Sequence, residues 1–259
     1  GSCGNSGYST ACKGYIKILI SLGYNIKFKP FRNEFNTNNE YDDLLLTQLT
    51  NNNIDYDIII CHTLPTFWDL FKEKNKYFIG LFAWETNKLP TEYISNIQDA
   101  NKIIVPSKFN LKLVSKYNKN TYYIPHLIEN INIQPIHYNN NINKLDHITN
   151  NIYIEYGTPF KYIINNNSFI YYTIGTTEVR KNIDELINIY NKLEFDNILL
   201  YIKTNLWNNE NIIDIVSKYK YCRHKIIFNF DNINLIDLYN IHNKCNCFLS
   251  TSYGEGVGL

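Results

Sequence analysis

Two stretches of the chain place charged side chains where an open α/β sheet would bind a ligand. An apolar run ends at Gly175 and leads through a polar turn with Arg180 and Lys181 into a helical pattern of apolar residues. A second apolar run, residues 247–249, leads to Glu255 among glycines. Open α/β sheets bind ligands beyond the carboxyl ends of their strands, and helix N-termini there favour anions. The two stretches therefore predict a ligand with both phosphate and hydroxyl groups.

The alternation of elements predicts what positions these residues. Strand and helix patterns alternate through residues 15–125 and again through 169–249, which indicates right-handed crossovers and mostly parallel sheets. The predicted strands are residues 25–30, 54–61, 77–82, 102–105, 121–124, 169–174, 198–203, 225–230 and 247–249, with 152–156 as a candidate short strand inside the Asn-rich stretch. The predicted helices are residues 15–22, 41–49, 109–117, 183–193, 212–219 and 235–241, with a further helix start at residues 89–91.

The order of the motifs resembles the retaining, nucleotide-sugar-dependent glycosyltransferases of family four, which have the GT-B fold. The resemblance rests on Gly-x-x-Glu-x-Arg-Lys-Asn at 175–182 and Ser-x-Gly-Glu-Gly-x-Gly-Leu at 252–259. It continues upstream in Ser-Gly-Tyr-Ser (6–9), Trp-Glu-Thr-Asn-Lys-Leu-Pro (84–90), Ile-Val-Pro-Ser-Lys-Phe (104–109) and Ile-Pro-His (124–126). These six motifs stand in the order that such enzymes show, and the resemblance therefore covers most of the chain.

The resemblance implies an α/β fold of two Rossmann-like domains with mostly parallel sheets, facing each other across a cleft. We expect an acceptor-side domain at 1–130, an Asn-rich linker or insertion at 131–167, and a nucleotide-sugar-binding domain at 168–259. The chain lacks Met and begins without an apolar strand, and it ends inside an expected strand-to-helix turn. We therefore expect a fragment that lacks the start and the end of the fold.

In the second half, the resemblance implies a donor site. Arg180 and Lys181 would stabilise the leaving diphosphate; the alternative is a solvated basic turn. Glu255 would accept hydrogen bonds from sugar hydroxyls. Lys203, at a strand end, is either a charge for a phosphate or a solvated residue. The remaining donor-site candidates are the backbones of Gly175, Gly256, Val257 and Gly258. Many relatives carry a basic residue where this chain has Thr176.

In the first half, three positions suit the acceptor side. His62 follows a continuous apolar run, residues 58–61, that is typical of a strand buried on both faces. A histidine there is either structural or, by the resemblance, the acceptor-side histidine near the transferred sugar. Trp84 and Glu85 suit stacking on a sugar and hydrogen bonds to its hydroxyls; a packing Trp with a helix-capping Glu is the alternative. Gly7 lies in a glycine-rich turn and would approach the donor phosphates, or else belongs to a plain loop.

Composition limits the partners and the compartment. The net charge of +1 gives no bulk reason to expect nucleic acid, and peripheral contact with a membrane has no support in the sequence. No apolar run reaches the roughly 18 residues of a membrane span. The six cysteines lack zinc-site spacing and indicate free thiols in a reducing, cytoplasmic compartment. No Asp-x-Asp ends a strand, so we predict transfer without a metal or other cofactor.

The sequence thus predicts a hexosyltransferase-type enzyme that moves a sugar from a nucleotide-diphosphate sugar to a glycan, lipid or protein acceptor. Two alternatives stay open: an inactive module that binds nucleotide or sugar, and another GT-B enzyme such as a phosphorylase or epimerase. A dehydrogenase fits less well, because no Gly-x-Gly-x-x-Gly opens a helix after a strand.

Overall fold

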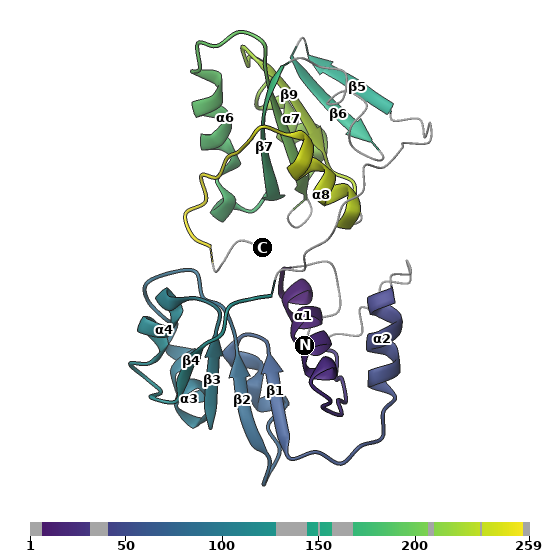
Figure 1. Cartoon of the computed structure of the whole chain (residues 1–259). Helices are drawn as coiled ribbons and strands as arrows, with labels where there is room; N and C mark the ends of the chain where they lie inside the picture. The colour runs from purple at the N-terminus through teal and green to yellow at the C-terminus, as the bar shows by residue number, and fades with distance from the viewer. Residues whose placement is uncertain are drawn as a thin grey trace. The chain divides into compact units, whose positions relative to one another are not determined.

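The chain folds into two α/β units (Figure 1). The computed structural model describes residues 7–31, 41–127, 144–149, 151–156, 168–206, 210–233 and 235–255. The first unit comprises Gly1–Asn130 together with Glu255–Leu259, and the second comprises Ile131–Gly254. No helix within these described ranges is long and apolar enough to cross a membrane.

The first unit is built on a four-stranded, fully parallel sheet. In spatial order its strands are β1 (Ile58–His62), β2 (Tyr77–Leu81), β3 (Lys102–Val105) and β4 (Thr121–Tyr123). The helical elements are α1 (Gly7–Ser21), α2 (Tyr41–Thr50), η1 (Pro65–Leu70), α3 (Thr91–Asp99) and α4 (Lys108–Val114). Ser107 is the N-cap of α4, since its Oγ accepts a hydrogen bond of 3.1 Å from the backbone N–H of Asn110.

Trp68 is the largest fully buried side chain of the first unit, and a glycine makes room for it. A Cβ placed on Gly80 in β2 would lie 2.2 Å from Cη2 of Trp68. The indole N–H donates to the carbonyl oxygen of Thr63 at 3.1 Å, which satisfies its one polar group. Trp68 therefore fixes η1 against the sheet directly after His62.

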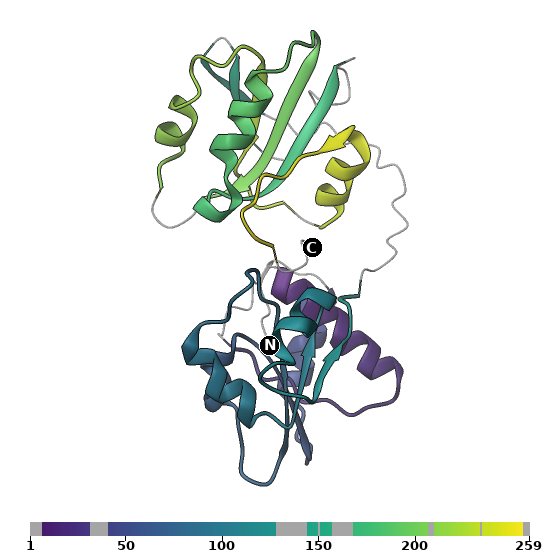
Figure 2. The same ribbon diagram turned by 90° about the vertical axis from the view of Figure 1, so that its left-hand side faces the viewer.

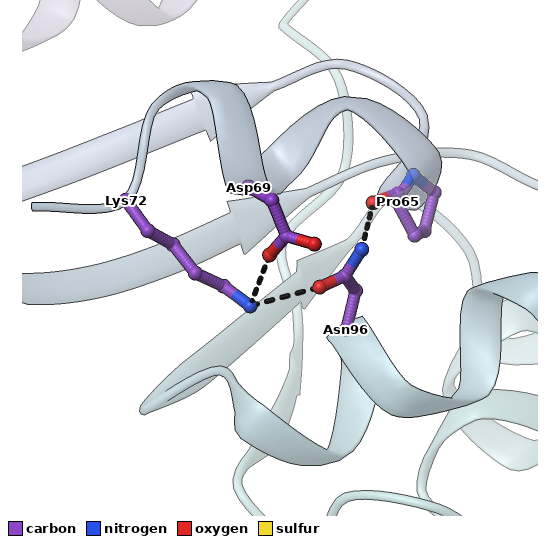
Figure 3. A network of polar contacts seen from close by, with 4 residues as sticks. All are labelled: Pro65, Asp69, Lys72 and Asn96. Atoms are coloured by element: carbon purple, nitrogen blue, oxygen red, sulfur yellow. Dashed lines mark hydrogen bonds and ion pairs between the residues drawn. The ribbon is translucent and has the colours of Figure 1, made fainter.

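Polar contacts also connect η1 and the residues after it to α3 (Figure 3). The Lys72 ammonium donates to Asp69 Oδ1 and to Asn96 Oδ1, each at 2.9 Å. The Asn96 amide in turn donates to the carbonyl oxygen of Pro65 at 2.9 Å. Asn96 is buried and both ends of its amide are satisfied, so the connection after β1 is held in one conformation.

The second unit has a six-stranded sheet with the order β10-β7-β8-β9-β6-β5, parallel except for the pair of β5 and β6. Its strands are β5 (Lys144–Thr149), β6 (Ile152–Tyr156), β7 (Phe169–Thr176), β8 (Ile198–Asn205), β9 (Lys225–Asn229) and β10 (Cys247–Phe248). The helical elements are η2 (Val179–Lys181), α6 (Ile183–Asn191), α7 (Ile212–Ser217) and α8 (Leu235–Lys244).

Helices cover both faces of this sheet (Figure 2). Residues of α6 and α7 pack with one set of strand side chains, including Leu200 and Ile202. Ile241 of α8 packs with the opposite set, including Leu199 and Tyr201. Burial on both faces explains why β8 is a continuous apolar run through Ile202.

Three expectations on the fold were wrong. Residues 25–30 form no strand; the backbone N–H of Phe28 bonds only the end of α2, at Leu49 O. The run in β1 is not buried on both faces, because Ile58 and Ile60 are 56% and 43% exposed. Residues 131–167, expected as a linker or insertion, contribute β5 and β6 to the second sheet, so the linker interpretation is wrong, whereas β6 has the bounds of the candidate strand at 152–156.

Candidate functional site

The order of strands in the second unit creates a topological switch point between β7 and β10. From β7 the chain continues through α6 to β8 on one side, whereas β10 lies on the other side of β7 and is reached through α8. The loops that follow β7 and β10 therefore leave neighbouring strand ends. Such a point is where open α/β sheets bind ligands.

Hydrogen bonds join these two loops to each other. Arg180 Nη1 donates to the carbonyl oxygen of Gly254 at 2.8 Å, and the backbone N–H of Tyr253 donates to the carbonyl oxygen of Arg180 at 2.9 Å. Thr251 Oγ1 donates to Asn182 O at 2.8 Å, and the Asn182 side chain donates to Thr251 O at 3.3 Å. The structure thus brings together the basic turn and the start of the glycine-rich stretch that the sequence paired.

The turn itself is shaped by two residues. Asn182 adopts the left-handed conformation, with φ of 53°, which an Asn side chain tolerates better than most, and it ends η2 directly before α6. A Cβ on Gly175 would lie 3.4 to 3.5 Å from carbons of the Lys181 side chain, so the lysine stem passes over the glycine. Arg180 also pairs with Glu178 at 3.1 Å, and both side chains are about a quarter exposed. Part of the arginine charge is therefore balanced within the turn.

Lys203 is buried, which excludes the solvated strand end as its environment. Only 5% of the residue is exposed, and its ammonium donates to Thr204 O and Asn205 Oδ1, each at 3.0 Å. Burial lowers the Lys203 pKa from 10.5 to about 8, while the charge of Asp231 acts in the opposite direction. The side chain lies on the same sheet face as Tyr201, whereas its neighbour Ile202 faces α6 and α7.

The remaining donor-side predictions stay untested. Glu255 is half-buried and falls in the first unit. Gly256, Val257 and Gly258 lie outside the described residues.

In the first unit, His62 sits in a cluster of rings at the carboxyl end of β1. Tyr8 lies against it with ring centroids 4.9 Å apart, and Tyr15 meets it edge-on at 6.1 Å. His126 follows β4 and has its ring centroid 6.3 Å from that of His62. Tyr8 is anchored on the next strand end, because its hydroxyl both donates to Ala83 O and accepts from Ala83 N–H at 3.2 Å.

Burial holds these groups in their neutral forms. His62 is 5% exposed, and desolvation, with a smaller contribution from His126, lowers its pKa from 6.5 to about 3. Burial also lowers the pKa of His126 and raises the pKa values of Tyr8 and Tyr15 to about 12. The Nδ1 atom of His62 is buried and has no hydrogen-bond partner among the described residues. An unsatisfied buried nitrogen of this kind is suited to a polar ligand group.

Trp84 is held by the protein around it. Its indole N–H donates to Thr86 Oγ1 at 3.0 Å and to Lys88 O at 2.8 Å, and its ring meets Tyr93 edge-on at 5.2 Å. The buried Asn110 side chain bonds both the backbone N–H and the carbonyl oxygen of Trp84, at 3.0 and 2.7 Å. These contacts favour the packing interpretation of Trp84 over stacking on a sugar.

Glu85 and Gly7 lie at the same rim as His62. Glu85 is half-buried and close enough to Tyr8 to contribute to its raised pKa. Gly7 is the first residue of α1, so the predicted glycine-rich loop is helical from that position. Its backbone N–H belongs to the first turn of a helix, where amide groups have no intrahelical acceptor.

The cluster contains three residues for which the sequence predicted no role in a site. From the sequence, Tyr15 was the first residue of a predicted helix, and Tyr8 and His126 were only members of motifs. The spacing of Tyr8 and Tyr15, seven residues or two helical turns, was the available signal, because it places both on one face. Among the described residues, no three His, Cys, Asp or Glu side chains gather as metal ligands would.

The chain matches no protein-family model and no curated protein. Among solved structures it is similar to a mutant of TarM from S. aureus in complex with fondaparinux, alpha-GlcNAc-glycerol and UDP. The identity is 15% and the TM-score 0.52, over 77% of this chain and 37% of TarM.

Two further structures are less similar. The apo form of the lipopolysaccharide outer core galactosyltransferase WaaB has 12% identity and a TM-score of 0.45, over 76% of this chain and 50% of WaaB. HepE from Anabaena in complex with UDP-glucose has 11% identity and a TM-score of 0.49, over 76% of this chain and 53% of HepE. The chain thus spans less than two thirds of each of these proteins. The likeness to TarM confirms the predicted fold class, an α/β fold of GT-B type with mostly parallel sheets.

Proposed function

We propose that this chain is part of a glycosyltransferase that moves a hexosyl group from a nucleotide-diphosphate sugar to an acceptor hydroxyl. The observation that carries this proposal is the hydrogen bond from Arg180 to Gly254 at the switch point of the second sheet. It joins a basic turn at a helix N-terminus to a glycine-rich loop, an arrangement suited to a ligand with phosphates and hydroxyls. The UDP named in the TarM complex is a ligand of this class.

On the donor side, each candidate has a distinct task. Arg180 and Lys181 stabilise the negative charge that develops on the leaving diphosphate, which makes a metal unnecessary. In this proposal Glu255 accepts hydrogen bonds from sugar hydroxyls, and the backbone N–H groups of Gly256, Val257 and Gly258 are donors for the nucleotide sugar. Lys203 has a positioning role: it is buried, and its bonds to Thr204 and Asn205 hold the carboxyl end of β8 in place.

On the acceptor side, His62 is the main candidate. Its pKa of about 3 keeps the imidazole neutral at physiological pH, so it forms hydrogen bonds with an uncharged hydroxyl without introducing a charge. Glu85 lies at the same rim and offers carboxylate oxygens. The acceptor is a glycan, a lipid or a protein, and the reaction retains the anomeric configuration.

Turnover tests this proposal directly. The chain is incubated with uridine, guanosine and adenosine diphosphate sugars and a panel of glycosides, with and without EDTA, and nucleoside diphosphate release is measured. We expect release from one donor, unchanged by EDTA, and a product whose anomeric signal in NMR matches that of the donor. Inversion would refute retention, and loss of activity in EDTA would refute metal independence. A sugar phosphate as product would favour a phosphorylase.

A binding module without turnover is the second candidate, and the Arg180–Glu178 pair favours it. That pair, 3.1 Å long, reduces the net positive charge of the turn, and Thr176 stands where many relatives carry a further basic residue. Nucleotide binding with no release of diphosphate from any sugar would support this candidate. Under either candidate, Glu178→Gln should strengthen nucleotide binding, because it leaves the charge of Arg180 unbalanced.

The cytoplasm is the compartment we propose. Cys61, Cys222, Cys245 and Cys247 form no disulfide within the part of the chain that the structure describes, and thiols of this kind are typical of a reducing compartment. Labelling of the folded chain with a thiol reagent, with and without prior reduction, measures whether these cysteines remain thiols when the protein is isolated.

A further inference from the structure

The hydroxyl of Tyr15 defines which ring nitrogen of His126 carries the proton. Its oxygen lies 3.2 Å from the carbonyl oxygens of Ile124 and Pro125 and 3.1 Å from Nδ1 of His126. A carbonyl oxygen only accepts. Donation of the single hydroxyl hydrogen to Nδ1 would leave the phenol oxygen facing both carbonyl oxygens at 3.2 Å with no hydrogen between them, so we place this hydrogen on one of the two carbonyl contacts. The phenol oxygen is then the acceptor for Nδ1–H of His126. In this tautomer, the lone pair of the ring lies on Nε2.

A second observation shows that the surroundings of His126 are suited to a ligand. The ring of His62, 6.3 Å away, has its Nδ1 buried without a partner among the described residues. Tyr15 meets both imidazoles edge-on, at 6.1 and 5.9 Å, so one residue holds the two rings in place. A buried polar atom without a partner is costly, and a bound hydroxyl would remove that cost.

We propose that His126 is a second imidazole of the acceptor-side site, and that Tyr15 fixes its tautomer so that Nε2 accepts a hydrogen bond from a hydroxyl of the acceptor sugar. This inference rests on the proposed function, because it assigns the acceptor of that reaction to the sugar alcohols. Tyr15 is a positioning residue: it acts on the substrate only through His126.

The chain offers matched variants for a test. Tyr15→Phe removes the hydroxyl that contacts His126 and keeps the ring. Tyr8→Phe makes the same chemical change on the same helix face, but the hydroxyl that it removes is bonded to Ala83 instead. His126→Asn keeps a donor for Tyr15 in the place of Nδ1–H and lacks Nε2.

Imidazole 15N NMR spectra of the whole chain report the tautomer without any substrate. His126→Asn assigns the His126 signals by their loss. We expect protonated Nδ1 and unprotonated Nε2 in the wild type and in Tyr8→Phe, and a mixture of tautomers in Tyr15→Phe. Protonated Nε2 in the wild type, or the same tautomer in Tyr15→Phe, would overturn the role of Tyr15.

Titration with methyl glucoside, methyl galactoside and methyl N-acetylglucosaminide then tests the ligand. At least one should shift the His126 Nε2 signal, and its affinity should fall about three- to tenfold in Tyr15→Phe, as for the loss of one neutral hydrogen bond. Tyr8→Phe should keep the affinity of the wild type. If no glycoside shifts the Nε2 signal, the sugar site is refuted. These spectra need no nucleotide sugar, so failure of the transferase proposal would appear separately, as absence of turnover.

Discussion

The neutral state of His62 makes the stability of the first unit depend on pH. Its pKa is about 3 in the folded chain and 6.5 in the unfolded one, so the unfolded chain binds the proton more readily. The contribution of this residue to stability is therefore complete above pH 6.5 and decreases as the pH falls toward 3. At one pKa unit per 1.36 kcal/mol, we expect a loss of about 2 kcal/mol between pH 7 and pH 5.

His62→Gln removes this titration and keeps an uncharged polar side chain. We would measure urea unfolding of both proteins at pH 7 and pH 5 and take the difference between them, which cancels the other titrating groups. Two of the three tryptophans, Trp68 and Trp84, lie in the first unit. In a Trp207→Phe background, fluorescence therefore reports the unfolding of that unit.

The expected result is that the stability of the wild type relative to His62→Gln falls by about 2 kcal/mol from pH 7 to pH 5. His126→Gln should change in the same direction but by less, because His126 is only half-buried. A pH-independent difference for His62→Gln would refute the reasoning, since it would mean that His62 is as accessible to protons in the folded chain as in the unfolded one.

Two further predictions concern packing and charge. Gly80→Ala should destabilise the first unit by about 3 kcal/mol, because the new Cβ would lie 2.2 Å from Trp68, whereas Gly14→Ala, with only Leu127 at 3.5 Å, should be neutral or stabilising; equal urea midpoints for both would contradict this. Arg180→Ala should lower turnover roughly 100- to 1000-fold, and Thr251→Val, which removes one neutral bond between the same loops, by less than about tenfold. Equal losses in steady-state kinetics would mean that Arg180 acts by holding the loops and not by its charge.

Most strands were predictable from the sequence, because runs of β-branched, aliphatic and aromatic residues stand between polar turns. The bounds of β3, Lys102–Val105, are those that the apolar pattern predicts, and β8 was found at its predicted start. The meeting of the loops after β7 and β10 was also predictable, because the carboxyl ends of parallel strands lie at one edge of the sheet. The Arg180–Gly254 bond is the local consequence.

Tertiary contacts determine the secondary structure of the segments that were not predictable from the sequence. Residues 7–14 contain glycines and small polar residues, which favour a loop, yet they are helical because Ala11 and Cys12 are buried in the core. Residues 25–30 have the composition of a strand, but the backbone of Phe28 bonds Leu49 and the backbone of Ile26 accepts from the side chain of Asn52. Composition alone does not supply the neighbouring ladder that a strand requires.

The groups that surround a polar side chain could not be predicted from the sequence either. The sequence left Lys203 as either a charge for a phosphate or a solvated residue at a strand end, and only the fold shows its ammonium bonded to Thr204 and Asn205. His126 and Tyr15 are more than a hundred residues apart in sequence. They meet because α1 and the segment that follows β4 come together at the carboxyl ends of the strands. No local pattern encodes such a contact.

The most direct test of the central claim is nucleotide binding at the basic turn. Isothermal titration of the whole chain with uridine, guanosine and adenosine diphosphates, with and without Mg²⁺, measures it. The account predicts that one of them binds, with an affinity that Mg²⁺ does not change and that falls at least tenfold when Arg180 and Lys181 are both Ala. Binding that is unaffected by the double substitution, or no binding of any nucleotide, would contradict it.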